Sequence, residues 1–548
     1  MGKRICRRKY DWCRKKGGTA DAKALQKQES VVEHLTISIP LNKVKLSTVD
    51  QVDAHESDQP LIISIHLDKM LRESGCLKLP SQRTLREYRH IGTASQGFSR
   101  LLDEQLMKAA EIDTLELWQK CVILILDEMS IHEDLVYDKH SGELIGYTNL
   151  GDINNHLLAF EKSLSDPGPP EIANSMLMFM VQGLFIPLQF PYCQFPCCSV
   201  TGDLLFKPIW EAVYRIERCG FQVLGITFDG APANRRFLKL HNASSSHAIT
   251  YKVQNKYDPQ RFIYFFSDPS HLIKTARNCL ASSARHMQYK GKSITIKHIE
   301  EVYYIDKGNS IGLSLLPKIK LEHIKLTAFS KMRVDLATQL LSESVSKALH
   351  LLGGPDAEET ANFIALFDKF FYSFNVSNYT EANRHRKPFR QPYRSSDDFR
   401  LDWLQNEFLG YLTKWEEHVN GIEGINAKTR KSMLLSPQTL LGLKITVNSF
   451  VEMVKYLFSL EGVKSFLSNR ISQDPIEKFF GCQRQRLSTN ENPNAYEFSK
   501  STETLRVVNS ICRPSVHGNC RATATTDTID LAKERRPLHK RRSHRKTL

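Results

Sequence analysis

Runs of apolar residues in the first half of the chain predict the strands of a buried sheet. Val122–Leu126 is unbroken, and Phe221–Phe228 and Arg261–Phe266 are mostly apolar. Runs of this length are typical of strands that are covered on both faces. A hairpin around the Lys139–Gly142 loop, counted as one element, and the stretch Ser175–Phe185 complete three antiparallel strands at the start of the sheet. The pattern therefore predicts a mixed sheet of five strands.

Helical spacing fills the intervals between these strands. Thr201 can cap one helix, and Asp268 followed by Pro269 has the residues that begin another. The order of three antiparallel strands, helix, strand, short helix, strand and helix is that of an RNase H-like fold. In such a sheet the first and fourth strands are parallel neighbours about 4.8 Å apart. This arrangement would bring Asp127 and Asp229, which stand at the ends of those strands, to one edge of the sheet.

The middle of the chain has helical periodicity and no strand rhythm. Residues 316–352 and 434–461 predict long amphipathic helices. They indicate an insertion domain with its own core, placed between the fifth strand and the segment that closes the sheet. The fold class is therefore α/β: an RNase H-like mixed five-stranded sheet interrupted by an all-helical insertion, with a small N-terminal helical module.

These changes of pattern predict six regions. The apolar positions from Phe98 to Ala110 recur at helical spacing, which suits either a helix-turn-helix for DNA or an ordinary packing hairpin. The predicted regions are a basic arm and linker (1–55), a helical module (56–118), the first part of the RNase H-like domain (119–285), the helical insertion (286–465), the closing part of the RNase H-like domain (466–510) and a basic tail (511–548).

Charge is concentrated at the two ends of the chain. The 548 residues carry a formal net charge of +15, and residues 1–16 and 533–548 each contribute +7, so the rest is nearly neutral at +1. Tails of this kind contact polyanions or act as nuclear import signals; solubilising ends are the alternative. We expect a nuclear protein.

Composition excludes several classes of protein. Hydrophobic residues make up 41% and charged residues 25%, which excludes collagen-like and wholly disordered chains. The longest apolar stretch, 176–195, is interrupted by polar residues and proline, and no apolar segment follows the basic N-terminus, so we expect neither a membrane helix nor a secretory signal. The twelve cysteines include no C-x-x-C pair, which favours reduced thiols.

Three carboxylates are candidates for metal chemistry. An Asp after a strand is often a turn former, and this reading stays open for Asp127 and Asp229. The third candidate is Glu477, although Asp474-Pro-Ile-Glu477 also has the residues of a capping box at a helix start. Hard oxygen ligands favour Mg²⁺ or Mn²⁺ over zinc.

The same residues fall in motifs that resemble a known family. The motifs are Asp127-Glu-Met-Ser-Ile131, Asn149-Leu-Gly-Asp152, Phe228-Asp-Gly-Ala-Pro-Ala-Asn-Arg-Arg-Phe237, Asp268-Pro-Ser-His-Leu-Ile-Lys274 and Asp474-Pro-Ile-Glu-Lys-Phe-Phe-Gly481. In this order they resemble P element transposases, the cut-and-paste group that includes THAP-type proteins. The resemblance covers roughly residues 60 to 525.

The resemblance implies an RNase H-like catalytic domain with an Asp, Asp, Glu metal triad and an insertion associated with GTP binding. Carried onto this chain, the triad is Asp127, Asp229 and Glu477, with Mg²⁺ or Mn²⁺ and with GTP as cofactors. Asp127 would bridge two ions, and each of the other two carboxylates would help to hold one. The implied partners are transposon ends and target DNA, and pairing of two ends implies a homo-oligomer.

The chain also departs from the family pattern. THAP-type members begin with a zinc module, but the first 60 residues hold only Cys6 and Cys13, which are too far apart to start one. Either the sequence begins downstream of that module, or this copy has lost specific end recognition and relies on the helical module and the basic tails. No G-x-x-x-x-G-K-[ST] loop is present, and we interpret Asn255-Lys-Tyr-Asp258 as a chance match to a guanine-reading motif. His271 is interpreted as structural.

The function predicted from the sequence is a P element-type DNA transposase that cuts and joins DNA strands through the acidic triad, either as an active element or as a domesticated descendant. Two alternatives remain: a nuclear DNA-binding or scaffold protein without turnover, and a nuclease that never joins strands. Metal-dependent cleavage separates the first alternative from an enzyme, and covalent joining of a 3′ hydroxyl end to target DNA separates the second from a transposase.

Overall fold

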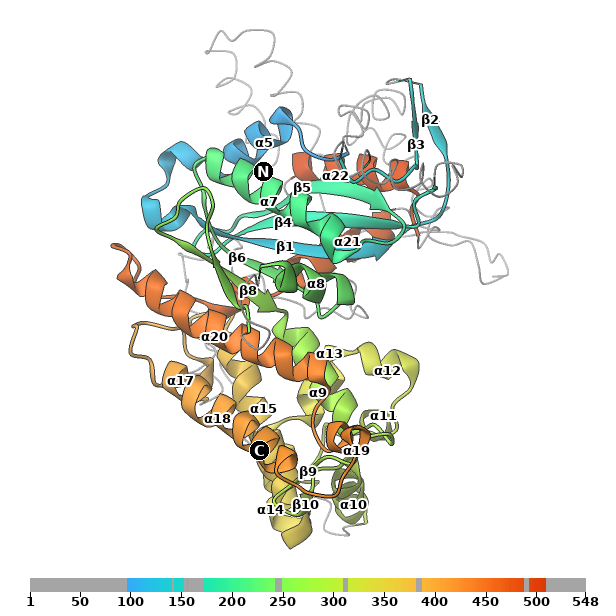
Figure 1. Cartoon of the computed structure of the whole chain (residues 1–548), viewed down its shortest axis with the longest axis vertical. Helices are drawn as coiled ribbons and strands as arrows, with labels where there is room; N and C mark the ends of the chain where they lie inside the picture. The colour runs from blue at the N-terminus through green and yellow to red at the C-terminus, as the bar shows by residue number, and fades with distance from the viewer. Residues whose placement is uncertain are drawn as a thin grey trace, which may run out of the picture. The chain divides into compact units, whose positions relative to one another are not determined.

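The structure is a computed structural model of the chain, and Figure 1 shows its elements. It describes residues 96–139, 142–151, 155, 171–241, 249–308, 314–380, 387–486 and 492–508. The predicted N-terminal arm, most of the predicted helical module and the C-terminal tail therefore lie outside the described residues. Within the described part of the module, the chain forms helix α5 (Arg100–Ala110), which Ser99 caps through its side chain. None of the described helices has the length and apolar character needed to cross a bilayer.

The chain divides into two compact units. The larger unit contains the described residues of Gln96–Leu135 and Gly146–Cys482. The smaller unit contains Val136–Ile145 and the described residues of Gln483–Ser510. All the predicted site residues lie in the larger unit.

A mixed sheet forms the centre of the larger unit, with the strand order β5-β4-β1-β6-β8-β7. Strand β1 is parallel to β6, and β6 is parallel to β8, whereas the other neighbours are antiparallel. The strands are β1 (Cys121–Ser130), β4 (Ser175–Gly183), β5 (Gln189–Cys197), β6 (Gln222–Phe228), β7 (Lys252–Gln254) and β8 (Phe262–Ser267). The predicted RNase H-like arrangement and the parallel pairing of the first apolar run with the Phe221–Phe228 run are confirmed.

Two features of the predicted sheet are wrong. The hairpin around the Lys139–Gly142 loop is not one of its strands, because β2 (Val136–Asp138) and β3 (Glu143–Ile145) form a separate two-stranded sheet in the smaller unit. The third strand is instead β5, whose Pro191 and Pro196 argue against a central strand but are tolerated at a sheet edge. The short strand β7 at the opposite edge raises the count from five to six.

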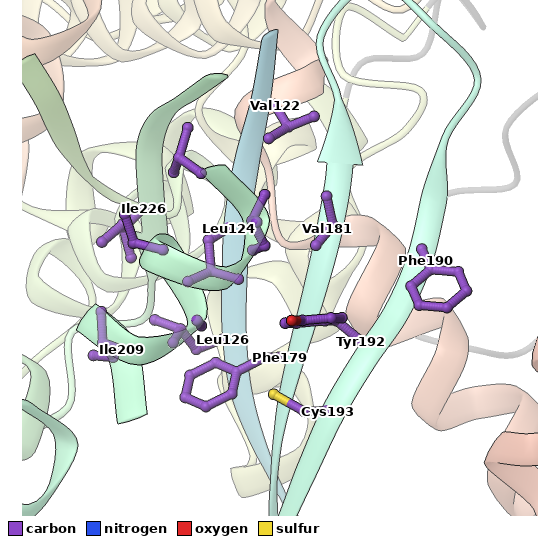
Figure 2. Close-up of a cluster of buried hydrophobic side chains, with 14 of the residues drawn as sticks. Val122, Leu124, Leu126, Phe179, Val181, Phe190, Tyr192, Cys193, Ile209 and Ile226 are labelled. Atoms are coloured by element: carbon purple, nitrogen blue, oxygen red, sulfur yellow. The ribbon is translucent and has the colours of Figure 1, made fainter. Parts of the chain in front are cut away.

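Helices close the two faces of this sheet. Successive side chains of β1 point to opposite faces, and both Leu124 and Ile125 are fully buried. Val122, Leu124 and Leu126 belong to one buried cluster with Ile209 of helix α7 (Gly202–Arg218), and in Figure 2 Leu124 and Leu126 lie on the side of β1 where Ile209 is. Thr201 caps α7 through its side chain, as predicted. Helix α8 (Pro232–Leu240) follows β6.

A helical insertion separates helix α9 (Pro269–Leu280) from helix α21 (Asp474–Arg486). Its aromatic core includes Phe363, Phe367 and Trp415. A two-stranded hairpin of β9 (Gln288–Tyr289) and β10 (Lys292–Ser293) also lies here, so the insertion is mainly helical and the prediction of an all-helical insertion is wrong in this detail. The α-helices among the described residues of the insertion are α10 (Ile296–Lys307), α11 (Leu321–Ile324), α12 (Ala328–Met332), α13 (Val334–Leu340), α14 (Glu343–Leu352), α15 (Glu358–Phe374), α17 (Phe399–Asp402), α18 (Leu409–Asn420), α19 (Ala427–Ser432) and α20 (Pro437–Ser459).

Only one of the two long helices predicted in the insertion is observed. Helix α20 accounts for the apolar pattern of 434–461, but 316–352 forms four short helices, α11 to α14. Within 316–352, extended backbone interrupts the helical pattern at Thr327, whose hydroxyl caps α12, and at Ser342, which precedes α14. Side chains that cap a new helix offer the backbone an alternative to continuing the previous one.

Helix α20 returns to the sheet and packs against β8. The Thr446 hydroxyl accepts a hydrogen bond from the Ser267 amide at 2.9 Å and donates one to the Ser267 carbonyl at 2.8 Å. A side chain at Gly442 would come within 2.7 Å of Leu272 Cδ2, so glycine permits the close approach of α20. The insertion is therefore fixed to the strand that leads into α9.

The smaller unit holds the β2–β3 hairpin and helix α22 (Ala495–Val508) together with the last residues of α21. The carboxylate of Asp138 lies 3.8 Å from the ammonium of Lys500, and the Gln483 amide donates to the Thr502 hydroxyl at 2.9 Å. These contacts connect the hairpin with the end of the described chain within this unit.

Candidate active site

Asp127 and Asp229 lie at the carboxyl ends of two neighbouring parallel strands. The register pairs Ile125 of β1 with Thr227 of β6, so each Asp stands two residues beyond a paired position. Because the two strands are parallel and each Asp lies the same number of residues beyond the paired position, the two carboxylates lie at the same edge of the sheet. The sequence prediction of this juxtaposition is confirmed.

The pKa of Asp127 reflects the burial and the charges at this edge of the sheet. Burial raises the pKa of Asp127 to about 7, and the negative charges of Asp229 and Glu477 add to that shift. The charge of His271 and the amide of Glu128, which donates to Asp127 Oδ1 at 2.9 Å, act in the opposite direction. Two further acids and one histidine therefore lie close enough to influence this carboxyl group.

Asp229 also shapes the backbone that follows it. Its Oδ1 accepts hydrogen bonds from the Ala231 amide and from Asn234 Nδ2, both at 2.8 Å. The carboxylate thus orders the turn that leads into α8. The turn-forming interpretation that the sequence left open is correct for Asp229. Both of these hydrogen bonds use Oδ1 and neither uses Oδ2.

Glu477 reaches this edge because the segment before α21 is bound to the strand ends. The Thr227 hydroxyl donates to the Ile471 carbonyl at 2.8 Å. Gln473 is fully buried, and its side-chain Nε2 donates to the Leu126 carbonyl at 2.7 Å. The main-chain carbonyl of Gln473 accepts a hydrogen bond from the Glu477 amide at 3.1 Å. Residues more than 240 positions apart in sequence are held together by these bonds.

Asp268 joins helix α9 to the same place. It is fully buried, and its Oδ1 accepts the Gln473 amide at 2.9 Å while its Oδ2 accepts the His271 amide at 2.7 Å. Burial alone would raise the pKa of Asp268, but hydrogen bonds and the charge of His271 outweigh it and hold the pKa below its ordinary value. Asp268 is therefore an ionised cap within the protein.

His271 lies between Asp268 and the acids of the sheet edge. Its Nδ1 is 3.1 Å from Asp268 Oδ2 and 4.0 Å from Glu477 Oε1, and its side chain is 30% exposed. Burial would lower the pKa of His271, but Asp268 raises it above the ordinary value. A structural role for His271 accounts for its bond to Asp268. Its position beside Glu477 could not be inferred from the sequence.

The three predicted carboxylates are neighbours, although their side chains do not converge on one point. Among the described residues, no group of three or more His, Cys, Asp and Glu side chains is arranged to hold a metal ion. The chemistry of the donors nevertheless suits a hard divalent cation, because all three are carboxylates and because burial, with smaller contributions from the charges of Asp229 and Glu477, disfavours the ionised form of Asp127.

The residues that imitate a guanine-reading motif have structural partners. Asn255 is fully buried and donates to Glu217 Oε1 at 2.7 Å, and Asp258 accepts from Arg261 Nε at 2.8 Å. Arg261 also forms a buried ion pair with Glu217 at 2.6 Å. These side chains brace α7, β7 and β8, so they are used within the RNase H-like domain.

The fold and the acidic sheet edge define an RNase H-like domain split by a helical insertion. Three family models match the chain in order: the TNP-like RNase H N-terminal domain over residues 94–242, the TNP-like GTP-binding insertion domain over 270–388, and the TNP-like RNase H C-terminal domain over 469–501. The chain belongs to the P element transposase family.

Two curated relatives and one solved structure illustrate the relationship. The chain is 28% identical to Transposable element P transposase of Drosophila melanogaster over 296 residues, which are 52% of this chain and 35% of that protein. It is 23% identical to DNA transposase THAP9 of Homo sapiens over 444 residues, 78% of this chain and 45% of that protein. The chain thus spans less than half the length of both curated relatives. The solved Drosophila P element transposase strand transfer complex has a similar fold, with a TM-score of 0.62 at 23% identity over 82% of this chain and 89% of that one.

Proposed function

We propose that this protein is a P element-type DNA transposase that cleaves DNA strands and joins them to a target. The observation that supports the proposal is the parallel register of β1 and β6 at the edge that carries Asp127 and Asp229, to which Gln473 binds the start of α21 through the Leu126 carbonyl. Carboxylates gathered from three distant segments against their mutual repulsion are typical of functional sites.

In this proposal Asp127, Asp229 and Glu477 hold Mg²⁺ or Mn²⁺. The ions would supply activation of the attacking oxygen and stabilisation of the leaving oxygen in an in-line displacement. The chain's own contribution is positional. Gln473 and Asp268 fix the starts of α21 and α9 to the strand ends, and His271 offsets part of the negative charge beside Asp127.

The wider proposal names the partners. DNA is the substrate, with contacts from the basic tails, and GTP is the ligand of the insertion, whose family model is described as GTP-binding. A nuclear location follows from action on DNA and from the import-like basic ends. A homo-oligomer is required if two ends are joined in one event.

The direct test is nicking of supercoiled plasmid by the purified chain in Mn²⁺, compared with Asp127→Ala. We expect the variant to lose at least a hundredfold in rate, because truncation removes a ligand shared by the site. Asp203→Asn is the matched control, since Asp203 is an exposed acid of the same domain whose ion pair with Arg236 lies at the surface. Equal nicking by the wild type and Asp127→Ala would refute the mechanism.

One observation favours a second candidate, a DNA-binding protein that keeps the fold without turnover. The Asp229 and Asp127 carboxylates each use one oxygen in a local backbone bond, and no ready set of metal ligands occurs among the described residues. Salt-sensitive DNA binding together with no cleavage in Mg²⁺ or Mn²⁺ would support this candidate. Covalent transfer of a labelled 3′ hydroxyl end to plasmid would establish joining and exclude a simple nuclease.

A further inference from the structure

Helix α12 displays two large apolar side chains to solvent. Phe329 is 62% exposed and Met332 is 63% exposed. Three residues apart, they are neighbours on one side of the helix. Ser330 is the buried residue of α12, so this short helix presents nearly all of its side-chain surface outward.

The helix is held in place by a buried arginine. Arg277 of α9 is fully buried and donates from Nη2 to the carbonyls of Ser330 and Lys331 at 3.0 and 3.1 Å. Asn278 donates to the same Lys331 carbonyl at 3.2 Å. These bonds occupy the carbonyls at the end of α12 and fix the orientation of the exposed pair.

The surroundings of this pair are strongly basic. Residues 315–335 contain five Lys or Arg against Glu322 and Asp335, a net charge of +3, whereas residues 17–532 as a whole carry +1, and Arg333 is paired with Asp335. Within the described part of the chain, Lys318, Lys320, Lys325 and Lys331 form no ion pair. We call Lys325, Phe329, Lys331 and Met332 the α12 surface. Unpaired cations around an apolar pair are complementary to a polyanion that also exposes flat apolar groups.

Helix α9 links the α12 surface to the acidic sheet edge. Asp268 caps the first turn of α9 beside His271, and Arg277 follows nine residues later. At 1.5 Å per residue, Asp268 and Arg277 are about 14 Å apart along the axis of α9, which continues to Leu280. A nucleic acid strand rises about 3.4 Å per nucleotide, so this span corresponds to about four nucleotides.

We propose that the α12 surface binds DNA about four nucleotides from the phosphate at the acidic edge, and that it prefers unpaired bases there. Phe329 and Met332 would pack on an exposed base, as aromatic and other apolar side chains do on bases that have left the stack. Lys325 and Lys331 would contact the flanking phosphates. The inference rests on the proposed function in taking DNA as the substrate at that edge.

The test measures fluorescence anisotropy of the full chain with two labelled DNAs of one sequence: a blunt duplex and a duplex with a four-nucleotide single-stranded 3′ overhang. Phe329→Ala and Met332→Ala should each weaken overhang binding by about fivefold or more, with a smaller effect on the blunt duplex. Leu351→Ala is the matched control, because Leu351 is 69% exposed at the end of α14 and lies outside the α12 surface. It should leave both affinities unchanged.

The charge contribution has its own readout. The double variant Lys325→Ala/Lys331→Ala should weaken binding to both DNAs and make the slope of log affinity against log salt less negative by about 1.4 to 1.8, the counterion release expected for two phosphate contacts. Overhang affinity that is unchanged in Phe329→Ala and Met332→Ala would overturn the inference. So would a change confined to the oligomeric state or to binding of labelled GTP.

Parallel nicking assays separate this inference from the proposed function. If Asp127→Ala loses nicking while its overhang binding still depends on Phe329, both proposals stand. Dependence on Phe329 without any nicking by the wild type would keep the α12 surface and remove the enzyme. Nicking by the wild type with no role for Phe329 would do the reverse.

Discussion

Carboxylates at the sheet edge shape the backbone around them. Asp229 orders the turn into α8, and Asp268 caps α9 while it contacts the amide of Gln473. A local sequence reading presents turn former and functional acid as alternatives. A carboxylate has acceptor positions on two oxygens, so a local backbone bond on one oxygen is compatible with a second contact on the other, as in Asp268.

His241 allows a test of electrostatics away from the site. It lies among aromatic rings of α7, α8 and β8, where Trp210 Nε1 donates to its Nε2 at 3.0 Å and its Nδ1 donates to the Phe237 carbonyl at 2.9 Å. Burial lowers the pKa of His241, and the Phe237 carbonyl offsets this only in part. The neutral ring is therefore the form that the folded protein favours.

The sign of the resulting pH dependence follows from linkage. Because the pKa of His241 is lower in the folded state, the unfolded chain binds more protons below about pH 6.5, and this residue's contribution to stability is lost as the pH falls. His241→Phe, which keeps an aromatic ring, should remove that contribution. The melting temperature of the wild type minus that of the variant should be smaller at pH 5 than at pH 7.5. A constant difference would contradict the assignment.

At the scale of elements, the joint between β1, α9 and α21 depends on one side chain. Gln473 is the residue that the sequence analysis missed, because an isolated Gln carries no pattern and its partners lie more than 200 residues away. Its Nε2 satisfies the Leu126 carbonyl next to Asp127. Only the assembled fold reveals this contact.

Gln473→Met keeps the shape of the side chain and removes the donor to Leu126. We expect a loss of about 1–3 kcal/mol in the free energy of unfolding, because a buried carbonyl loses its partner, and a reduced nicking rate where Glu477 is displaced. Gln254→Met is the matched control, since Gln254 donates to the Pro259 carbonyl at 2.7 Å but is exposed. Urea unfolding of both variants gives the comparison. Equal losses in the free energy of unfolding would show that the Gln473 bond to Leu126 stabilises the fold no more than the exposed Gln254 bond does.

The sheet illustrates which elements can be predicted from sequence. Apolar runs identified β1, β4, β6 and β8, because strands covered on both faces must be apolar along their length. The edge strands were missed: β5 contains Pro191 and Pro196, and β7 has only three residues. The β2–β3 hairpin was recognised locally, but its pattern does not specify which sheet it joins.

At the scale of the whole molecule, charge is distributed unevenly. Residues 533–548 hold eight Lys or Arg, and we expect them to add phosphate contacts that are independent of sequence. Deleting residues 533–548 should make the slope of log affinity against log salt for blunt duplex DNA less negative by up to about 7. Replacing the same basic residues by Gln is the control for chain length. An unchanged slope in both variants would show that this tail does not contact DNA.

The sequence by itself determined the local features of this protein: the buried strands, the caps of α7 and α9, the basic ends and the order of motifs that indicates its family. These follow from interactions between residues a few positions apart, or from composition. The tertiary structure alone decided which distant residues meet. The insertion separates Glu477 from Asp229 by more than 200 residues, and the two segments are brought together by hydrogen bonds that Thr227 and Gln473 donate, one of them to the carboxylate of Asp268. Long-range contacts of this kind depend on the packing of the whole domain, which periodicity along the chain does not encode.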